Sequence, residues 1–457
     1  MNKLNHKTLY FFISLFLLPF LLVAVKKIIE LRKTALGRLA NITVDLNQTG
    51  QPINPNLWQN FTQGGEERNE MIKPALPWLT PLQPKFIRID HLYDYYEVLK
   101  SDGSFDFSKL DRVVVSILQT GATPMLSLSY IPPQMTQDKN ITSPPINWSL
   151  WQNLVKVTIK HYSGKNDLNI NNVYYEVFNE PDLFGQWHYH KSPNYLKLYY
   201  YSAKAAQEIQ PECQPFKIGG PATTGFYPNW VKALLKFASE QKLRLDFISW
   251  HQYSLLPQDY VQDLEAFNQI LTDYPEWLAI ERIISEFGPE TQKSIWYQNN
   301  IGAAHDLAVI TQVMDRVHKV FAFEIKDGPD DNQGWGLLTH QAKGGIRAKP
   351  RWLAYQFLNQ LTGTRTFLTG EGSWVYGIAS QDKSLVMIML VNYDPENKHF
   401  ESPPIKVFPL SPGKYKINLD YLFGQDTRLT GNTTDNSLFF RVALEPNEAV
   451  IISIEPL

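Results

Sequence analysis

Apolar runs alternate with amphipathic helical stretches between about residues 85 and 362. The run VYYEVF at 173–178 is short, β-branched and aromatic, and the sequence Asn-Glu-Pro follows it directly. Such a run predicts a buried strand that the proline terminates, since proline donates no ladder hydrogen bond. The stretch 107–118 instead places its apolar residues at helical spacing. Strands that alternate with helices in this way predict a mostly parallel sheet covered on both faces.

The alternation contains seven or eight strand–helix units, which favours a closed (β/α)8 TIM barrel of the α/β class over an open sheet. A doubly wound open sheet would need a glycine-rich phosphate-binding turn, and none is apparent. Beyond residue 363 the pattern changes to short alternating strands separated by Gly, Pro and Asn, as is typical of a β-sandwich. We therefore expect an N-terminal segment (1–40), a barrel (41–362) and a C-terminal β-sandwich (363–457).

The N-terminal segment contains an apolar stretch, residues 9–25, with no charged side chain and with lysines on both sides. Its length lies between that of a signal-peptide core and that of a membrane span. No small-residue cleavage site follows it directly, so we expect an uncleaved transmembrane anchor more than a cleaved signal. The single cysteine, Cys213, is ordinary for a bacterial periplasmic protein. We expect a membrane-anchored protein whose bulk is extracytoplasmic, in the periplasm or on the cell surface.

Composition excludes some classes of function. The 43 Lys and Arg residues nearly balance the 45 Asp and Glu residues, and no basic block interleaves with aromatic residues, so we expect no nucleic-acid partner. The histidines show no paired ligand spacing such as His-x-x-x-His, so we expect no metal site, and we expect no cofactor. The 12 Trp and 23 Tyr suit stacking on sugar faces, but they suit core packing equally well.

Two glutamates carry the candidate chemistry. Glu180 and Glu286 each follow a strand-forming run, and each precedes a strand-breaking sequence. In a (β/α)8 barrel, catalytic groups lie at the C-terminal ends of the strands. Hydrolysis of a glycosidic bond with retention needs one carboxylic acid to protonate the leaving oxygen and a second carboxylate to attack the anomeric carbon. Asn-Glu-Pro-Asp alone also occurs as a simple polar turn, so this interpretation depends on the rest of the chain.

Several motifs occur in order over about three hundred residues. They are FIRID (86–90), GATPMLSLSYIP (121–132), YEVFNEPD (175–182), KIGGPA (217–222), FISWHQY (247–253) and GLLT (336–339) followed by Lys349-Pro350. With these motifs the chain resembles glycoside hydrolase family 39, a family of retaining glycosidases, from about residue 41 to residue 361. The resemblance implies a glycosidase with Glu180 as acid/base and Glu286 as nucleophile. It also implies that Asn179 contacts the 2-hydroxyl, that Arg88 supports the nucleophile, and that His251, Tyr253 and Asp327 line the sugar subsite.

The chain departs from the family pattern in two places. Asp90 occupies a position where the family tends to have histidine, with His91 displaced by one, and Phe323 stands where it usually has tryptophan. Glu324 and Lys326 follow Phe323, and either would favour a charged or amino-bearing sugar if it pointed into the cleft. The alternative is an ordinary charge at a strand end. These differences mean that the xylosidase and iduronidase specificities of the family do not transfer directly.

Three functions stay open at this point. The first is a retaining glycosidase acting on an extracytoplasmic oligo- or polysaccharide, with the pKa of Glu180 raised and Glu286 charged. The second is a catalytically silent carbohydrate-binding protein on the same scaffold. The third is a transglycosylase, which would use the same covalent intermediate. Both glutamates keep their strand-end context, and this favours an enzyme over a binding protein.

Overall fold

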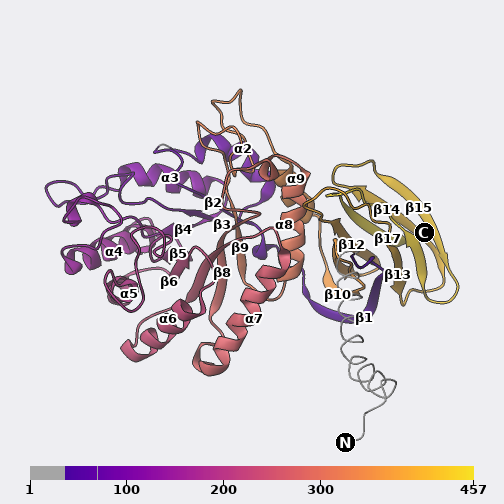
Figure 1. Cartoon of the computed structure of the whole chain (residues 1–457), viewed down its shortest axis with the longest axis horizontal. Helices are drawn as coiled ribbons and strands as arrows, with labels where there is room; N and C mark the ends of the chain where they lie inside the picture. The colour runs from indigo at the N-terminus through magenta and orange to yellow at the C-terminus, as the bar shows by residue number, and fades with distance from the viewer. Residues whose placement is uncertain (1–36, 69) are drawn as a thin grey trace, which may run out of the picture.

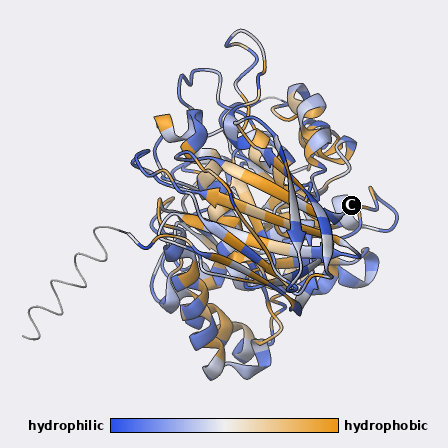
Figure 2. Cartoon of the chain, turned by 90° about the vertical axis from the view of Figure 1, so that its right-hand side faces the viewer, coloured by the Kyte–Doolittle hydropathy of each residue, from blue (hydrophilic) through white to orange (hydrophobic). Residues whose placement is uncertain are grey.

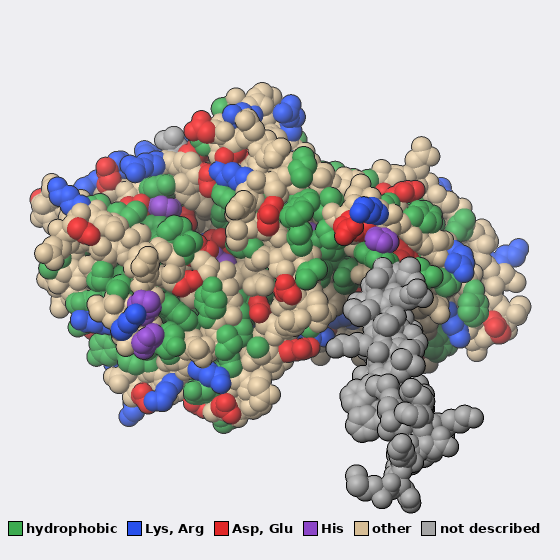
Figure 3. Space-filling model, in the orientation of Figure 1, with side chains coloured by type: hydrophobic (Ala, Val, Ile, Leu, Met, Phe, Trp, Pro, Cys, Tyr) green, Lys and Arg blue, Asp and Glu red, His purple; other side chains and the backbone are tan. Residues whose placement is uncertain are grey.

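The computed structural model describes residues 37–68 and 70–457. Most of the segment that we expected to form a transmembrane anchor, residues 1–40, lies outside these ranges. Within the described ranges, no helix combines the length and the apolar character needed to cross a membrane. On the face shown in Figure 3, acidic and basic side chains are interspersed, in keeping with a formal net charge of −2.

Eight parallel strands form a closed barrel, which confirms the predicted (β/α)8 architecture. The last strand pairs with the first, since Phe61 lies opposite Ala322. The strands are β2 (Asn60–Gln63), β3 (Phe86–Ile89), β4 (Thr123–Ser127), β5 (Val173–Glu176), β6 (Phe216–Thr223), β7 (Phe247–Tyr253), β8 (Glu281–Gly288) and β9 (Lys319–Phe323).

Helices surround the barrel, as Figure 1 shows. Their starts follow from local sequence: at α4, for example, the Asn147 side chain accepts hydrogen bonds from the backbone N–H groups of Ser149 and Leu150. The α-helices are α2 (Leu76–Leu79), α3 (Ser108–Gln119), α4 (Trp148–Ser163), α5 (Tyr195–Ile209), α6 (Pro228–Gln241), α7 (Pro257–Asp273), α8 (Asn300–Val313) and α9 (Pro350–Leu358). Short 3-10 helices are η1 (Pro55–Leu57), η2 (Lys73–Ala75), η3 (Thr80–Leu82), η4 (Pro133–Met135), η5 (Gln210–Glu212), η6 (Pro275–Trp277) and η7 (Ile295–Gln298).

A nine-stranded sheet forms the predicted β-sandwich, with the strand order β15-β14-β17-β12-β11-β10-β1-β13-β16. Its edge strands β15 and β16 contact each other, so the sheet curls around its own apolar core. Figure 2 faces this part of the molecule and shows apolar and polar residues alternating along the strands. The strands are β1 (Ile42–Pro52), β10 (Thr364–Thr369), β11 (Val375–Asp382), β12 (Leu385–Asn392), β13 (Pro404–Phe408), β14 (Gly413–Tyr421), β15 (Thr427–Thr433), β16 (Leu438–Arg441) and β17 (Ala449–Pro456).

Strand β1 belongs to the sandwich, which differs from our expectation that the barrel begins at residue 41. It pairs antiparallel with β10 and parallel with β13. Its buried residues Ile42 and Val44 join the apolar core of the sandwich. An alternating pattern predicts a strand with one buried face, but it does not specify which sheet the strand joins.

Helix α8 connects the two parts of the molecule (Figure 1). It is buried on nearly every side, as expected for a helix that is apolar all round. It contacts β8, α7 and α9 of the barrel and also β11 and β12 of the sandwich. Across the same interface the Tyr393 hydroxyl donates to the Leu255 carbonyl at 2.7 Å. The sandwich is therefore packed firmly against the barrel.

A buried ion pair joins α8 to α9. The Arg351 guanidinium donates to both carboxylate oxygens of Asp306, at 2.9 and 3.3 Å, and both side chains are fully buried. Its remaining nitrogen, Nη1, donates to the carbonyls of Phe323 and Trp335, each at 2.9 Å. Arg351 therefore fixes the segment that follows β9.

Arg351→Met is expected to lower the free energy of unfolding by about 3–5 kcal/mol, because it leaves the Asp306 carboxylate buried without its partner. The matched control is Lys236→Met, which breaks an exposed pair with Glu240 and should cost less than about 1 kcal/mol. Denaturant-induced unfolding of the two variants measures both values. Equal, small losses would contradict a structural role for the pair.

Candidate active site

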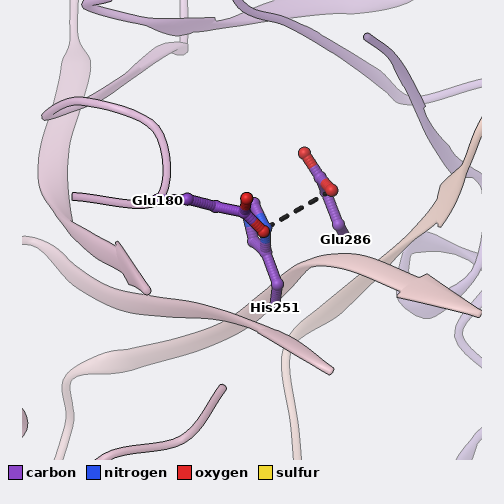
Figure 4. A group of neighbouring side chains, drawn as sticks. All are labelled: Glu180, His251 and Glu286. Carbon is purple, nitrogen blue, oxygen red and sulfur yellow. Dashed lines mark hydrogen bonds and ion pairs between the residues drawn. The ribbon is translucent and has the colours of Figure 1, made fainter. Parts of the chain in front are cut away.

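Four strand ends bring six predicted site residues together at one end of the barrel. Arg88 lies on β3, Asn179 and Glu180 follow β5, His251 and Tyr253 lie on β7, and Glu286 lies on β8. The pairing of β7 with β8 shifts register after Trp250, and this irregularity sets His251 opposite Glu286. Figure 4 shows Glu180, His251 and Glu286 converging on one another.

Arg88 donates hydrogen bonds to three residues of the cluster. Its Nε donates to Glu176 Oε2, its Nη1 to Glu286 Oε1 and its Nη2 to Asn179 Oδ1, each at 2.7 Å. The Arg88 and Glu176 side chains are fully buried. Because the guanidinium is planar and always charged, these three contacts fix both the position and the electrostatics of the acceptors. We did not predict Glu176, although it lies within the YEVFNEPD motif.

Glu286 is held from several sides. The Tyr253 hydroxyl donates to its Oε2 at 2.8 Å, and His251 Nδ1 lies 3.3 Å from the same atom. Burial raises the pKa of Glu286, and the charge of Glu180 adds to this effect, while His251 and Arg88 act in the opposite direction. We expected Glu286 simply to stay charged. Burial opposes this charged form, and the donors around Glu286, including Arg88 as expected, favour the carboxylate.

Glu180 lies on a sharply turned backbone. Its φ is 44°, and Phe178 two residues earlier has a φ of 72°. Such left-handed conformations cost non-glycine residues about 1–3 kcal/mol each and occur preferentially at functional sites. The backbone N–H of Glu180 donates to the Ala222 carbonyl at 2.9 Å, and its Oε1 lies 2.9 Å from His251 Nδ1. These contacts on β6 and β7 hold the carboxyl group in place.

The His251 ring links the two carboxylates. Its Nδ1 lies 2.9 Å from Glu180 Oε1 and 3.3 Å from Glu286 Oε2, within hydrogen-bonding reach of both. Burial lowers the pKa of His251, but the negative charges of Glu286 and Glu180 outweigh this effect and the pKa is raised. Glu180, His251 and Glu286 offer ligand atoms that all lie within 4.8 Å of one another, a spacing that also fits a metal ion. Arg88 and Tyr253 already donate to both oxygens of Glu286, which favours a hydrogen-bonding role for this cluster.

The pocket beside the cluster has a volume of about 340 Å³, near the small end of the range for ligand sites. Phe323 and Trp335 form an edge-to-face aromatic wall, with ring centroids 5.5 Å apart. Asn179 also lines the pocket, and its amide donates to the Tyr130 hydroxyl at 2.9 Å. We did not predict Tyr130, which lies in the GATPMLSLSYIP motif, or Trp335. Trp335 follows β9 in an irregular segment, where no strand pattern signals its place.

Asp327 does not line the pocket, although we expected it to bind substrate. Its Oδ1 accepts hydrogen bonds from the Gly336 N–H and from Lys349 Nζ, each at 2.7 Å, so it holds the segment after β9 together. Glu324 is fully buried and accepts from Gln63 at 2.8 Å, and burial raises its pKa well above the ordinary value. Lys326 forms an ion pair with Glu67. Neither of these charges is among the residues that line the pocket.

Comparison with known proteins assigns the family. The model of glycosyl hydrolases family 39 matches residues 41–299. The chain belongs to glycosyl hydrolase family 39. This membership identifies the protein as a glycosidase.

Two β-xylosidases are relatives of this family 39 glycosidase. That of Caldicellulosiruptor saccharolyticus is 30% identical over 336 residues, which are 66% of this chain and 67% of the relative. That of Geobacillus stearothermophilus is 27% identical over 171 residues, and this match spans only 35% of this chain and 33% of the relative.

Solved structures share the fold. The family 39 enzyme of Xanthomonas axonopodis pv. citri gives a TM-score of 0.73 at 20% identity, covering 92% of this chain and 98% of that one. A monomeric β-xylosidase of Caulobacter crescentus gives the same TM-score and identity, covering 92% of this chain and all of the other (100%). At this identity, the similarity supports the barrel-plus-sandwich architecture.

Tyr253→Phe is expected to move the acidic limb of the pH profile of kcat/KM upward by about one unit. The lost hydrogen bond stabilises the charged form of Glu286, and a bond to a charged group is worth about 1.5 kcal/mol. Without it the pKa of Glu286 rises further, so a higher pH is needed to ionise the group.

Tyr199→Phe is the matched control, because it removes a Tyr hydroxyl that donates to the Arg244 carbonyl at 2.8 Å, far from the carboxylates. The control should leave the acidic limb in place. If the acidic limb of the pH profile also stays in place in Tyr253→Phe, the Tyr253 hydroxyl does not lower the pKa of Glu286.

Proposed function

We propose that the protein is a retaining glycosidase with Glu180 as acid/base and Glu286 as nucleophile. The observation that carries the proposal is the closeness of the two groups, which present carboxylate oxygens within 4.8 Å of each other. Retaining glycosidases hold their carboxyl groups about 5–5.5 Å apart, whereas inverting enzymes need about 6.5–9.5 Å to admit a water between them.

In the first step, Glu180 donates its proton to the glycosidic oxygen while a Glu286 oxygen attacks the anomeric carbon. The bond to the leaving group breaks, and a glycosyl ester of Glu286 forms. In the second step, Glu180 takes a proton from water, the water oxygen attacks the anomeric carbon, and the ester bond breaks. Both carboxyl groups thereby return to their starting states.

The surrounding residues support these steps. Arg88 and Tyr253 donate to the Glu286 oxygens and stabilise the carboxylate both before attack and as it leaves the ester. His251 orients Glu180 through its Nδ1. The Asn179 amide donates one N–H to Tyr130, and it retains a second N–H that can donate to a sugar hydroxyl in the pocket.

The substrate class is part of the proposal. We infer that it is a β-glycoside of an oligo- or polysaccharide, since the two curated relatives are named β-xylosidases. We place this activity outside the cytoplasm, with the protein anchored by its N-terminus. The support for this location is the apolar stretch at residues 9–25. Release of the full-length protein from cell membranes by high salt alone would contradict the anchor.

Glu286→Gln and Glu180→Gln are expected to lose turnover of aryl β-glycosides, by at least about 10²–10⁴-fold for the acid/base. Azide should restore turnover to Glu286→Gly by attacking the anomeric carbon from the vacated face, giving an α-glycosyl azide. With Glu180→Gly, azide should attack the glycosyl ester and give a β-glycosyl azide.

Glu240→Gln, on the exposed surface of α6, controls for the loss of one carboxylate and should keep full activity. Undiminished turnover in Glu286→Gln, or an α-azide from the Glu180 variant, would overturn the assignment of roles.

A further inference from the structure

Asp90 is a buried acid with an unused acceptor beside the proposed catalytic pair. It directly follows β3 and lines the pocket, and its side chain is only 5% exposed. Its Oδ1 has no hydrogen-bond partner among the described residues. A buried polar atom without a partner is costly, so it needs an explanation such as a bound ligand.

The neighbouring cations do not satisfy Asp90. The guanidinium of Arg88 directs its hydrogen bonds to Glu176, Glu286 and Asn179. The ring of His91 bonds through Nδ1 to Asp94 at 2.8 Å. Burial raises the pKa of Asp90, although His91 and Arg88 act in the opposite direction. Asp90 therefore keeps an acceptor for a group that enters the pocket.

The charged side chains that line the pocket are mostly acidic. Besides Glu180 and Glu286, the lining contains two further acids, Asp90 and Glu66, and neither a lysine nor an arginine. Its one histidine, His91, is already paired with Asp94. Lys293 lies 3.5 Å from Glu66, but it also pairs with Asp331 at 2.5 Å. A carboxylate on an incoming sugar would therefore meet four acids and no lysine or arginine of the lining, and juxtaposed like charges disfavour binding.

We propose that Asp90 determines specificity, with its Oδ1 accepting a hydrogen bond from a hydroxyl or ammonium group of the sugar in the pocket. The acidic lining excludes uronic acids. The inference rests on the proposed glycosidase function and narrows its substrates to glycosides of neutral or free-amino sugars. Asp90 does not take part in bond breaking, so its effect appears in the preference between sugars.

The test compares wild type, Asp90→Asn and Asp90→Ala on 4-nitrophenyl β-glycosides of one ring series: glucoside, glucosaminide with a free amine, and glucuronide. Wild type should hydrolyse the glucuronide at least about 100-fold less efficiently than the better of the other two, because of charge repulsion. Asp90→Ala should lower kcat/KM on that better substrate by about 10- to 100-fold, the worth of a hydrogen bond to a charged group.

Asp90→Asn keeps the shape and one acceptor oxygen but removes the charge. If the sugar donor is an ammonium, this variant should lose more activity on the glucosaminide than on the glucoside. If the donor is a hydroxyl, the two losses should be equal and smaller than those of Asp90→Ala. In both cases the relative rate on the glucuronide should rise. Asp102→Asn, in an exposed turn, is the control that leaves all ratios unchanged.

Thermal unfolding shows whether each variant is folded. If Asp90→Ala is not folded, Asp90→Asn alone is used for the comparison. Efficient hydrolysis of the glucuronide by wild type, or substrate ratios that neither Asp90 variant changes, would overturn the proposal. If wild type hydrolyses none of the three and no 4-nitrophenyl β-xyloside either, the proposed function fails separately. The role of Asp90 is then tested by calorimetric measurement of the binding of the three methyl glycosides. The proposal is overturned if none of them binds, if all three bind equally, or if Asp90→Asn leaves their affinities unchanged.

Discussion

The buried guanidinium of Arg88 donates at 2.7 Å to Glu176, Asn179 and Glu286, which come from two different strands. An arginine taken out of water must find such partners, since an unpaired buried charge would be strongly destabilising. The same contacts give the site its chemistry, because the fixed positive charge opposes the effect of burial on the pKa of Glu286. Arg88 therefore contributes both to the stability of the barrel interior and to the ionisation of the proposed nucleophile.

A second layer of contacts holds the pocket wall. Arg351 on α9 pairs with Asp306 on α8 and donates to the Phe323 and Trp335 carbonyls, while Asp327 and Lys349 hold the segment between them. Helix α8 also packs against the sandwich, which explains why that domain adjoins the barrel at this point. The aromatic wall of the pocket is thus coupled to the interface between the two parts of the molecule.

Strand and helix periodicity predicted the barrel and the sandwich, and the ordered motifs placed Arg88, Asn179, Glu180, His251, Tyr253 and Glu286 at strand ends, where the structure brings them together. The predictions that differ from the structure do so for physical reasons. Strand β1 joins the sandwich because alternation encodes a buried face and not a partner sheet. Asp327 turns away from the pocket because Lys349, 22 residues later, pairs with it. Trp335 reaches the pocket from an irregular segment, whose course depends on the buried contacts of Arg351 and leaves no periodic signal.

The central claim is that Glu286 forms a covalent glycosyl intermediate, and the stereochemistry of hydrolysis tests it most directly. Proton NMR of the sugar released from an aryl β-glycoside, recorded before mutarotation, identifies the first anomer formed. Two displacements at the anomeric carbon predict that the β-anomer appears first. Initial appearance of the α-anomer would mean a single displacement by water, and it would contradict the roles assigned to Glu180 and Glu286.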